Sequence, residues 1–113
     1  MEEGAGGRRD RLVHYLPLAD EDLSFAYAMT RERWRKTQAE KYLDFLIQSC
    51  QEIADGAVQG HKLDGNPLIS MSVARFSSKR MSHGHRLFYR EVEGGIEIVR
   101  ILHTAMDWRD ENI

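Results

Sequence analysis

The last quarter of the chain constrains the fold most, because it contains two largely apolar segments joined by a glycine pair. An acidic turn, Glu93-Gly94-Gly95, separates the segments. The arm that follows, residues 96–102, is apolar apart from Glu97 and Arg100. A run of this kind, bounded by glycines, is typical of a strand covered on both faces. The sequence therefore predicts a β-hairpin here, with its second arm inside a sheet.

Arg100 is an unusual residue for such a strand. A guanidinium that is buried without a partner costs considerable free energy. Arg100 therefore marks either a structural ion pair or a functional surface, and structural pairing is the more frequent outcome for a single residue.

The size of the chain, 113 residues, predicts one domain with a real hydrophobic core. Its single cysteine, Cys50, excludes an internal disulfide and a cysteine-rich zinc site. No apolar run reaches the length of a membrane span, and no apolar segment follows the first charges as in a secretory signal. A cytoplasmic location is the expectation.

Charge is distributed unevenly, although the net charge is only −2. Residues 57–90 hold six basic side chains against the single acidic Asp64, whereas residues 91–113 hold two basic and six acidic ones. Dedicated nucleic-acid binders are usually basic overall. The mildly acidic total favours a protein target.

The chain divides into a flexible N-terminal extension, residues 1–10, and one domain, residues 11–113. Alternation predicts a short strand over 11–17, stopped by Pro17. Helical spacing predicts helices over 18–29 and 31–54, with a kink or cap at Thr30 and a stop at Gly56. The apolar stripe of the second helix comprises Ala39, Tyr42, Leu43, Leu46, Ile47, Cys50, Ile53 and Ala54.

A turn at Asp64-Gly65-Asn66-Pro67 precedes three further predicted strands, over 68–76, 86–92 and 96–103, with a connection or a bulged strand end over 77–84. The predicted fold is therefore α+β. A helical hairpin packs on a small, mainly antiparallel sheet, in the order β-α-α-β-β-β.

Metal and cofactor sites are not expected. His83 and His85 lie close together, but they lack helical ligand spacing and a neighbouring carboxylate or thiolate cluster. No glycine-rich phosphate loop is present. Cys50 lies on the apolar stripe, where a buried small hydrophobe is the simpler interpretation.

One basic, imidazole-containing set has the chemistry of RNA cleavage: His85, Arg86, Tyr89 and His103. A base would take the 2′-hydroxyl proton, an arginine would stabilise the phosphorane and a histidine would protonate the leaving oxygen. Strand alternation counts against this set, because it sends His85 and Arg86 to opposite faces unless a bulge intervenes. Structural or protein-contact roles are therefore favoured over catalysis.

The tail after the last strand, Met106-Asp107-Trp108, has two interpretations. Its indole either folds back onto the core or forms a contact patch, since tryptophan is enriched among interface anchors.

Several segments together resemble the ParE toxins of bacterial type II toxin–antitoxin systems, within the ParE/RelE superfamily. The resemblance covers about Leu12 to Trp108. It rests on residues 18–23 (LADEDL), Arg33-Trp34, 38–43 (QAEKYL), 85–90 (HRLFYR), 96–103 (IEIVRILH) and Met106-Asp107. It implies the same fold as the residues do. It also implies a growth-inhibiting toxin that is neutralised by a small DNA-binding, ParD-like antitoxin.

Within this superfamily, ParE-like members inhibit DNA gyrase, whereas RelE-like and YoeB-like members cut mRNA on the ribosome. The basic stretch that RelE-like chains carry after the last strand is absent here, because no basic residue occurs between His103 and Arg109. Another departure is Arg35, where ParE-like chains often have glycine. The motif His85-Arg86-Leu87 with Tyr89 nevertheless matches YoeB-like nucleases, in which the position of Arg86 is catalytic.

Gyrase inhibition by binding, without catalysis, is accordingly the preferred hypothesis. The expected target-binding residues are Arg86, Arg100, His103, Met106, Asp107 and Trp108. The alternatives are a ribosome-dependent mRNA endonuclease that uses His85, Arg86, Tyr89 and His103, and a non-toxic orphan binding module.

Overall fold

The computed structural model describes residues 11–77 and 82–113. The predicted flexible extension, residues 1–10, and the middle of the predicted connection over 77–84 lie outside these residues. The elements, in chain order, are β1 (Leu12–Tyr15), α2 (Pro17–Arg33), α3 (Lys36–Ala54), β2 (His61–Leu63), β3 (Asn66–Ser77), β4 (Ser82–Val92), β5 (Gly95–His103) and the 3₁₀ turn η1 (Trp108–Asp110).

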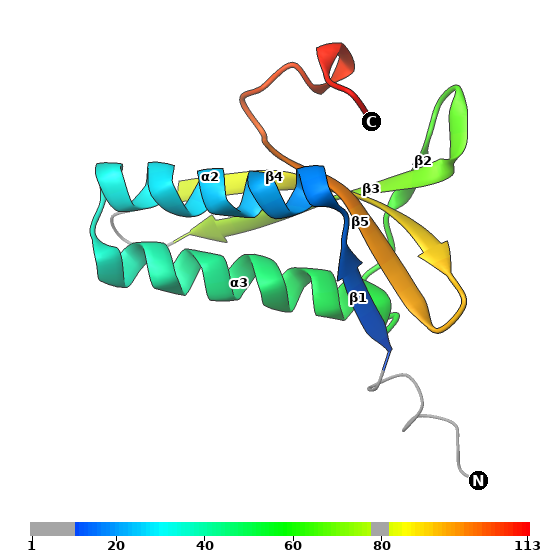
Figure 1. The fold of residues 1–113 in the computed structure, drawn as a ribbon, viewed down its shortest axis with the longest axis horizontal. Coiled ribbons are helices and arrows are strands. Elements are labelled where there is room, and N and C mark those ends of the chain that lie inside the picture. Colours follow the sequence, from blue (N-terminus) through cyan, green and yellow to red (C-terminus); the bar gives the residue numbers. More distant parts are fainter. Residues whose placement is uncertain (1–10, 78–81) are drawn as a thin grey trace, which may run out of the picture.

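The strands form one five-stranded mixed sheet in the order β1-β5-β4-β3-β2. β1 runs parallel to β5, and the other neighbours are antiparallel. α2 and α3 lie side by side along one face, while the C-terminal tail turns back on the side of α2 (Figure 1). The predicted α+β architecture is confirmed, with β2 as an additional strand.

The first helix departs from its predicted limits at both ends. Pro17 was expected to stop a strand, but it opens α2, where its fixed φ suits the first helical turn. The predicted break at Thr30 was wrong. The buried Thr30 hydroxyl donates to the carbonyl of Ala26 at 2.7 Å, so its hydrogen-bond donor is paired within the helix. The helix continues to Arg33.

The two helices are separated by Trp34 and Arg35 alone. Arg35 has φ −169° and ψ 163°, which is ordinary extended backbone. This sharp connection therefore requires no glycine, which accounts for the arginine at this position. No helix within residues 11–77 and 82–113 has both the length and the apolar character that a membrane crossing requires.

The predicted apolar stripe of α3 faces the sheet. Most of its members are buried, Leu43 is half-buried, and Ile47 is the exception, with 43% of its surface exposed. Gly56, with φ +82°, follows the end of the helix as predicted. Cys50 is fully buried, and burial raises the pKa of its thiol to about 12, so it packs as a small hydrophobe.

The strand β2 was not predicted, because three residues are too few to show alternation. It forms a tight hairpin with β3 through Asp64 and Gly65, the latter at φ +80°. Apolar side chains on the two faces of the sheet form separate clusters. One packs under the helices, and the other lies on the opposite face around Phe88, Leu102 and Trp108.

The β4–β5 hairpin contains a bulge that reorders the side chains of β5. Phe88 pairs with Arg100, but Tyr89 pairs with Ile98, so Val99 is the extra residue. Ile98 and Ile101 consequently both join the cluster under the helices, three residues apart. The bulge therefore also turns His103 toward the helix side, beside its cross-strand partner on β4.

Candidate functional site

Three imidazoles meet on the helix side of the sheet, at the end of β5. The ring centroids of His83 and His85 lie 5.5 Å apart, those of His85 and His103 5.2 Å, and those of His83 and His103 4.6 Å. β4 contributes the first two, and the pairing of His85 with His103, made possible by the bulge, contributes the third. We call these three residues the imidazole cluster.

Tyr42 of α3 packs against His83 and His85 of the cluster. Its hydroxyl lies 2.6 Å from Nδ1 of His85, and both side chains are buried. Burial, followed by the neighbouring His103 and His83, lowers the pKa of His85 to about 3. His85 is therefore neutral at pH 7, and its role in the cluster is structural.

The outer two imidazoles are less buried, but their pKa values are also lowered. For His83 the causes are burial, then His103 and then Arg33; for His103 they are burial, then Arg33 and then Arg86. The backbone N–H of Ala105 donates to Nδ1 of His103 at 3.0 Å. A neutral His103 must therefore carry its proton on Nε2, which suits hydrogen-bond donation and not metal ligation. Within residues 11–77 and 82–113, no group of three or more His, Cys, Asp or Glu side chains is arranged to hold a metal ion.

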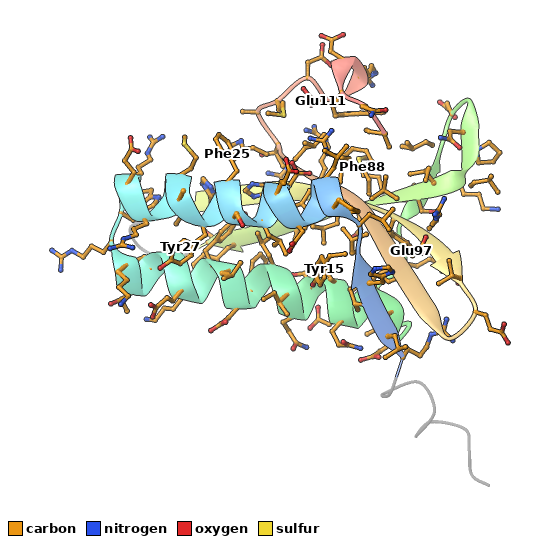
Figure 2. The ribbon with its side chains drawn as sticks, viewed as in Figure 1. Tyr15, Phe25, Tyr27, Phe88, Glu97 and Glu111 are labelled. Carbon is orange, nitrogen blue, oxygen red and sulfur yellow. The ribbon has the colours of Figure 1, made fainter. Side chains whose placement is uncertain are left out.

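A groove of about 240 Å³ opens over the cluster, between α2 and the free half of β5. Phe25, Met29 and Met106 form its rim and are 63%, 48% and 39% exposed. Phe25 lies on the side of α2 where the C-terminal tail turns back (Figure 2). Arg33 closes one end of the groove.

Arg100 and Asp22 form a buried ion pair at the other end. Nε and Nη2 of Arg100 donate to the two carboxylate oxygens of Asp22 at 2.8 and 3.1 Å. The same carboxylate accepts from the backbone N–H of Ile101 at 2.9 Å, at an edge of β5 that β1 does not reach. The hydrogen bonds to Asp22 raise the pKa of Arg100. Arg100 thus has the structural partner that a buried guanidinium needs.

The tail is held against the sheet at three points. Nη1 of Arg86 donates to the carbonyl of Thr104 at 2.7 Å, and Nη1 of Arg100 donates to the carbonyl of Asn112 at 3.1 Å. Between these points, the ring of Trp108 packs 5.4 Å from that of Phe88. The indole therefore folds back onto the core, although it remains half-buried and not fully covered.

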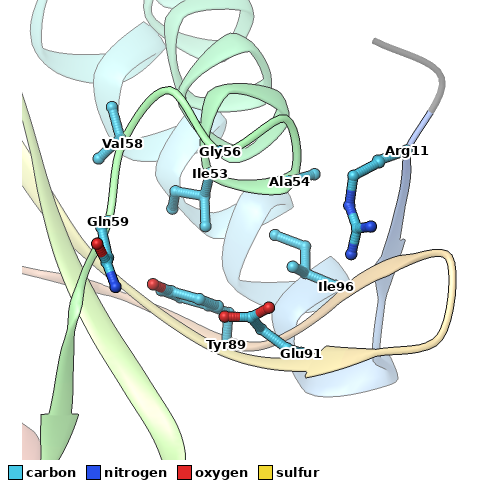
Figure 3. A pocket seen from close by; sticks show the side chains of 9 residues that line it. All are labelled: Arg11, Ile53, Ala54, Gly56, Val58, Gln59, Tyr89, Glu91 and Ile96. Carbon is cyan, nitrogen blue, oxygen red and sulfur yellow. The ribbon is translucent and has the colours of Figure 1, made fainter. Parts of the chain in front are cut away.

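The predicted nuclease residues are distributed over three places. His85 and His103 are together, but Arg86 pairs with Leu102 and shares its face of the sheet, away from the imidazoles. Tyr89 lies further along β4, where its hydroxyl accepts the N–H of Gly60 at 2.8 Å. There it lines a separate cavity of about 390 Å³ at the end of α3, with Arg11 and Glu91 (Figure 3).

The predicted target-binding residues also differ in availability. Arg86 and Arg100 are committed to holding the tail, and His103 lies in the groove. Met106 and Asp107 are exposed, and the guanidinium of Arg109 stacks 4.6 Å from the Trp108 ring. Asp22, Arg33 and Tyr42 lie in the segments that carry the family resemblance, but the sequence did not assign them to the site, because their contacts with it are distant in sequence.

Comparisons with known proteins agree with this architecture. Residues 13–108 match the family described as the ParE toxin of the type II toxin–antitoxin system, parDE. Toxin ParE1 from two strains of Mycobacterium tuberculosis is 36% identical over 93 residues, which is 80% of this chain and 87% of that protein.

A solved structure of the chromosomal ParDE TA system from P. aeruginosa has the same fold. It superposes with a TM-score of 0.59 at 13% identity, covering 84% of this chain and 97% of that one. The family match spans most of the chain, and the alignment covers 87% of the length of the M. tuberculosis toxins. The chain belongs to the ParE toxin family of type II toxin–antitoxin systems.

Proposed function

We propose that this toxin inhibits DNA gyrase by binding it, blocks replication in the cytoplasm, and catalyses no reaction. The separation of the nuclease-like residues is the observation that carries this proposal. General acid–base cleavage needs the base, the acid and the charge-stabilising group around one phosphate. Here Arg86 is held to the carbonyl of Thr104 on the other face of the sheet from His85 and His103. A contact surface is the simpler use of such an arrangement.

The C-terminal tail is the proposed target-binding surface. Its anchors, Arg86 and Arg100, position it, while Met106, Asp107 and Arg109 are exposed. The stacked pair of Trp108 and Arg109 supplies an aromatic and a cationic group, which are the residue types enriched among interface anchors. The fixed backbone lowers the entropic cost of binding.

The second proposed partner is a cognate ParD-like, DNA-binding antitoxin. Membership of a toxin–antitoxin family supports this partner. The exposed apolar rim of the groove gives an antitoxin segment a surface on which to fold as it binds.

Two assays test the proposed function. The toxin is expressed without antitoxin while DNA and protein synthesis are followed, and the purified toxin is titrated into a gyrase supercoiling reaction. Early arrest of replication with induction of the DNA-damage response, together with inhibited supercoiling, is the expected result. Immediate translational arrest with cut mRNA would falsify the proposal in favour of the endonuclease. An absence of any effect would favour the orphan binding module.

Arg109→Glu gives the surface-specific test. Because Arg109 is exposed and stacks on Trp108, its charge reversal should weaken gyrase inhibition by about tenfold while leaving the fold intact. Lys41→Glu, an equal charge change on the exposed face of α3, is the matched control and should retain full inhibition.

A further inference from the structure

The groove over the imidazole cluster offers hydrogen-bond donors and positive charge, but no free carboxylate or amide side chain among its described lining residues. Its one carboxylate, Asp22, is occupied by Arg100 and by the N–H of Ile101. Nε2–H of His103 is a donor, because Nδ1 already accepts from Ala105.

His85 also presents an N–H donor to the groove, as its hydrogen bond with Tyr42 indicates. The buried hydroxyl of Tyr42 donates to Nδ1, since a hydroxyl that only accepted would leave its own proton unsatisfied. This leaves Nε2 of His85 as a second N–H donor. Arg33 adds a full positive charge at the end of the groove.

Charge around that end of the groove has the same sign. The helix connection carries Arg31, Arg33, Arg35 and Lys36 against Glu32 within six residues. All five side chains are exposed. An approaching partner that is acidic would therefore be attracted to this end.

The rim is apolar, which restricts the kind of acidic partner. Phe25 and Met29 are one helical turn apart on α2, and Met106 faces them from the tail. A nucleic-acid backbone would leave these three side chains without apolar contacts. An amphipathic peptide segment would cover them.

We propose that this groove receives an acidic amphipathic segment of the antitoxin, with apolar side chains against Phe25, Met29 and Met106 and a carboxylate against His103, His83 and Arg33, and that binding takes up a proton at the imidazole cluster. The inference rests on the proposed antitoxin partnership. It adds a place, a chemistry and a pH dependence to that partnership.

The direction of the pH dependence follows from the groups that face the outer imidazoles. These are Arg33 from α2, Tyr42 from α3 and the Asp22–Arg100 pair at the far end, while Arg86 acts on His103 from the opposite face of the sheet. In the free toxin, burial, His103 and Arg33 lower the pKa of His83, and burial, Arg33 and Arg86 lower that of His103, so both are neutral at pH 7. A bound carboxylate raises the pKa of His83, since protonating His103 or His85 would break the hydrogen bond that its Nδ1 accepts. The complex then holds more protons than its separate components, and affinity rises as pH falls below the bound-state pKa.

The test is isothermal titration calorimetry of the full-length toxin with its cognate antitoxin, between pH 8 and pH 5.5. Titrations in two buffers of different ionisation enthalpy measure proton uptake directly. We expect net uptake near neutral pH and an affinity that increases as pH falls, by at most about tenfold per pH unit for one proton.

His83→Gln separates the proton from the packing. A glutamine amide keeps an N–H donor but does not titrate. This variant should bind at pH 8 as the native toxin does, and should lose most of the proton uptake. A purely structural His83 would change affinity equally at every pH.

Phe25→Glu places a negative charge, of the same sign as the proposed acidic segment, on the rim of the groove. It should weaken antitoxin binding by about tenfold or more. Ile47→Glu, an equal change at an exposed position on α3, is the control and should bind normally. Full-strength binding by Phe25→Glu, or binding without proton uptake, overturns this inference while leaving gyrase inhibition untouched. A single-stranded RNA whose binding is abolished by Phe25→Glu would also overturn it. Failure of the toxin to bind its antitoxin would refute the partnership itself.

Discussion

At the scale of single residues, Asp22 combines three contacts that the fold needs. It neutralises Arg100, it accepts from an unpaired backbone N–H of β5, and it ties α2 to the sheet. The two charged side chains are only 11% and 14% exposed, so solvent screens them little. The sequence indicated that Arg100 needs a partner, but identified neither that partner nor its place on α2.

Replacing Asp22 should therefore be strongly destabilising. Asp22→Asn leaves the buried Arg100 with only its longer ion pair to Glu111, at 3.5 Å, and we expect a loss of about 3 kcal/mol in the free energy of unfolding. Urea denaturation of this variant, beside Glu21→Gln as the exposed neighbour, measures the difference. A loss below about 1 kcal/mol would show that solvent or Glu111 replaces the carboxylate.

His85 should make stability depend on pH. Its pKa in the folded state, about 3, lies below its ordinary value of 6.5, so the unfolded chain binds the proton more tightly. Stability is complete above pH 6.5 and is lost as pH falls from there toward 3. Between pH 7.5 and pH 5.5 one such imidazole should cost about 1.4 kcal/mol. His85→Gln should remove that part of the loss in paired urea titrations, and an unchanged slope would contradict the assignment.

At the scale of elements, the sequence predicted those that burial marks with a clear apolar pattern. The stripe of α3 was visible because burial on one side imposes a spacing of 3.6, and β5 was visible because a strand covered on both faces is an almost continuous apolar run. The helix break at Thr30 was misplaced, because a threonine that bonds back to Ala26 looks like a cap in sequence. The bulge at Val99 changed the alternation locally. Only the three-residue step between Ile98 and Ile101 signalled it.

The parallel pairing of β1 with β5 depends on Gly95. A Cβ at this position would lie 2.0 Å from the carbonyl oxygen of Leu12, which is backbone and cannot move without displacing β1. Gly95→Ala should cost at least about 2 kcal/mol and should increase hydrogen exchange of the β1 amides. Gly94→Ala is the control. Its φ of +84° costs about 1 kcal/mol, but nothing lies within 4 Å of the added carbon.

At the scale of the whole molecule, the two faces of the sheet have different tasks. The helices cover one face and form the larger core, with the groove at its open end. The other face has a small core that only the tail completes, through Trp108 on Phe88. The sequence left the role of Trp108 open between core and contact patch. Its half-buried position beside the exposed Arg109 allows it to pack on the outer core and also to contribute to a contact patch.

This dual position separates stability from inhibition in one pair of variants. Trp108→Ala uncovers the outer core, so it should lower the free energy of unfolding by about 2 kcal/mol and, on the proposed mechanism, reduce gyrase inhibition. Arg109→Glu should reduce inhibition with stability unchanged, because it contributes a charge and no burial. Urea denaturation and the supercoiling assay on the same preparations give both quantities. If Trp108→Ala lost stability but kept full inhibition below its unfolding transition, the tail would be a structural strap and the target would bind elsewhere on the toxin.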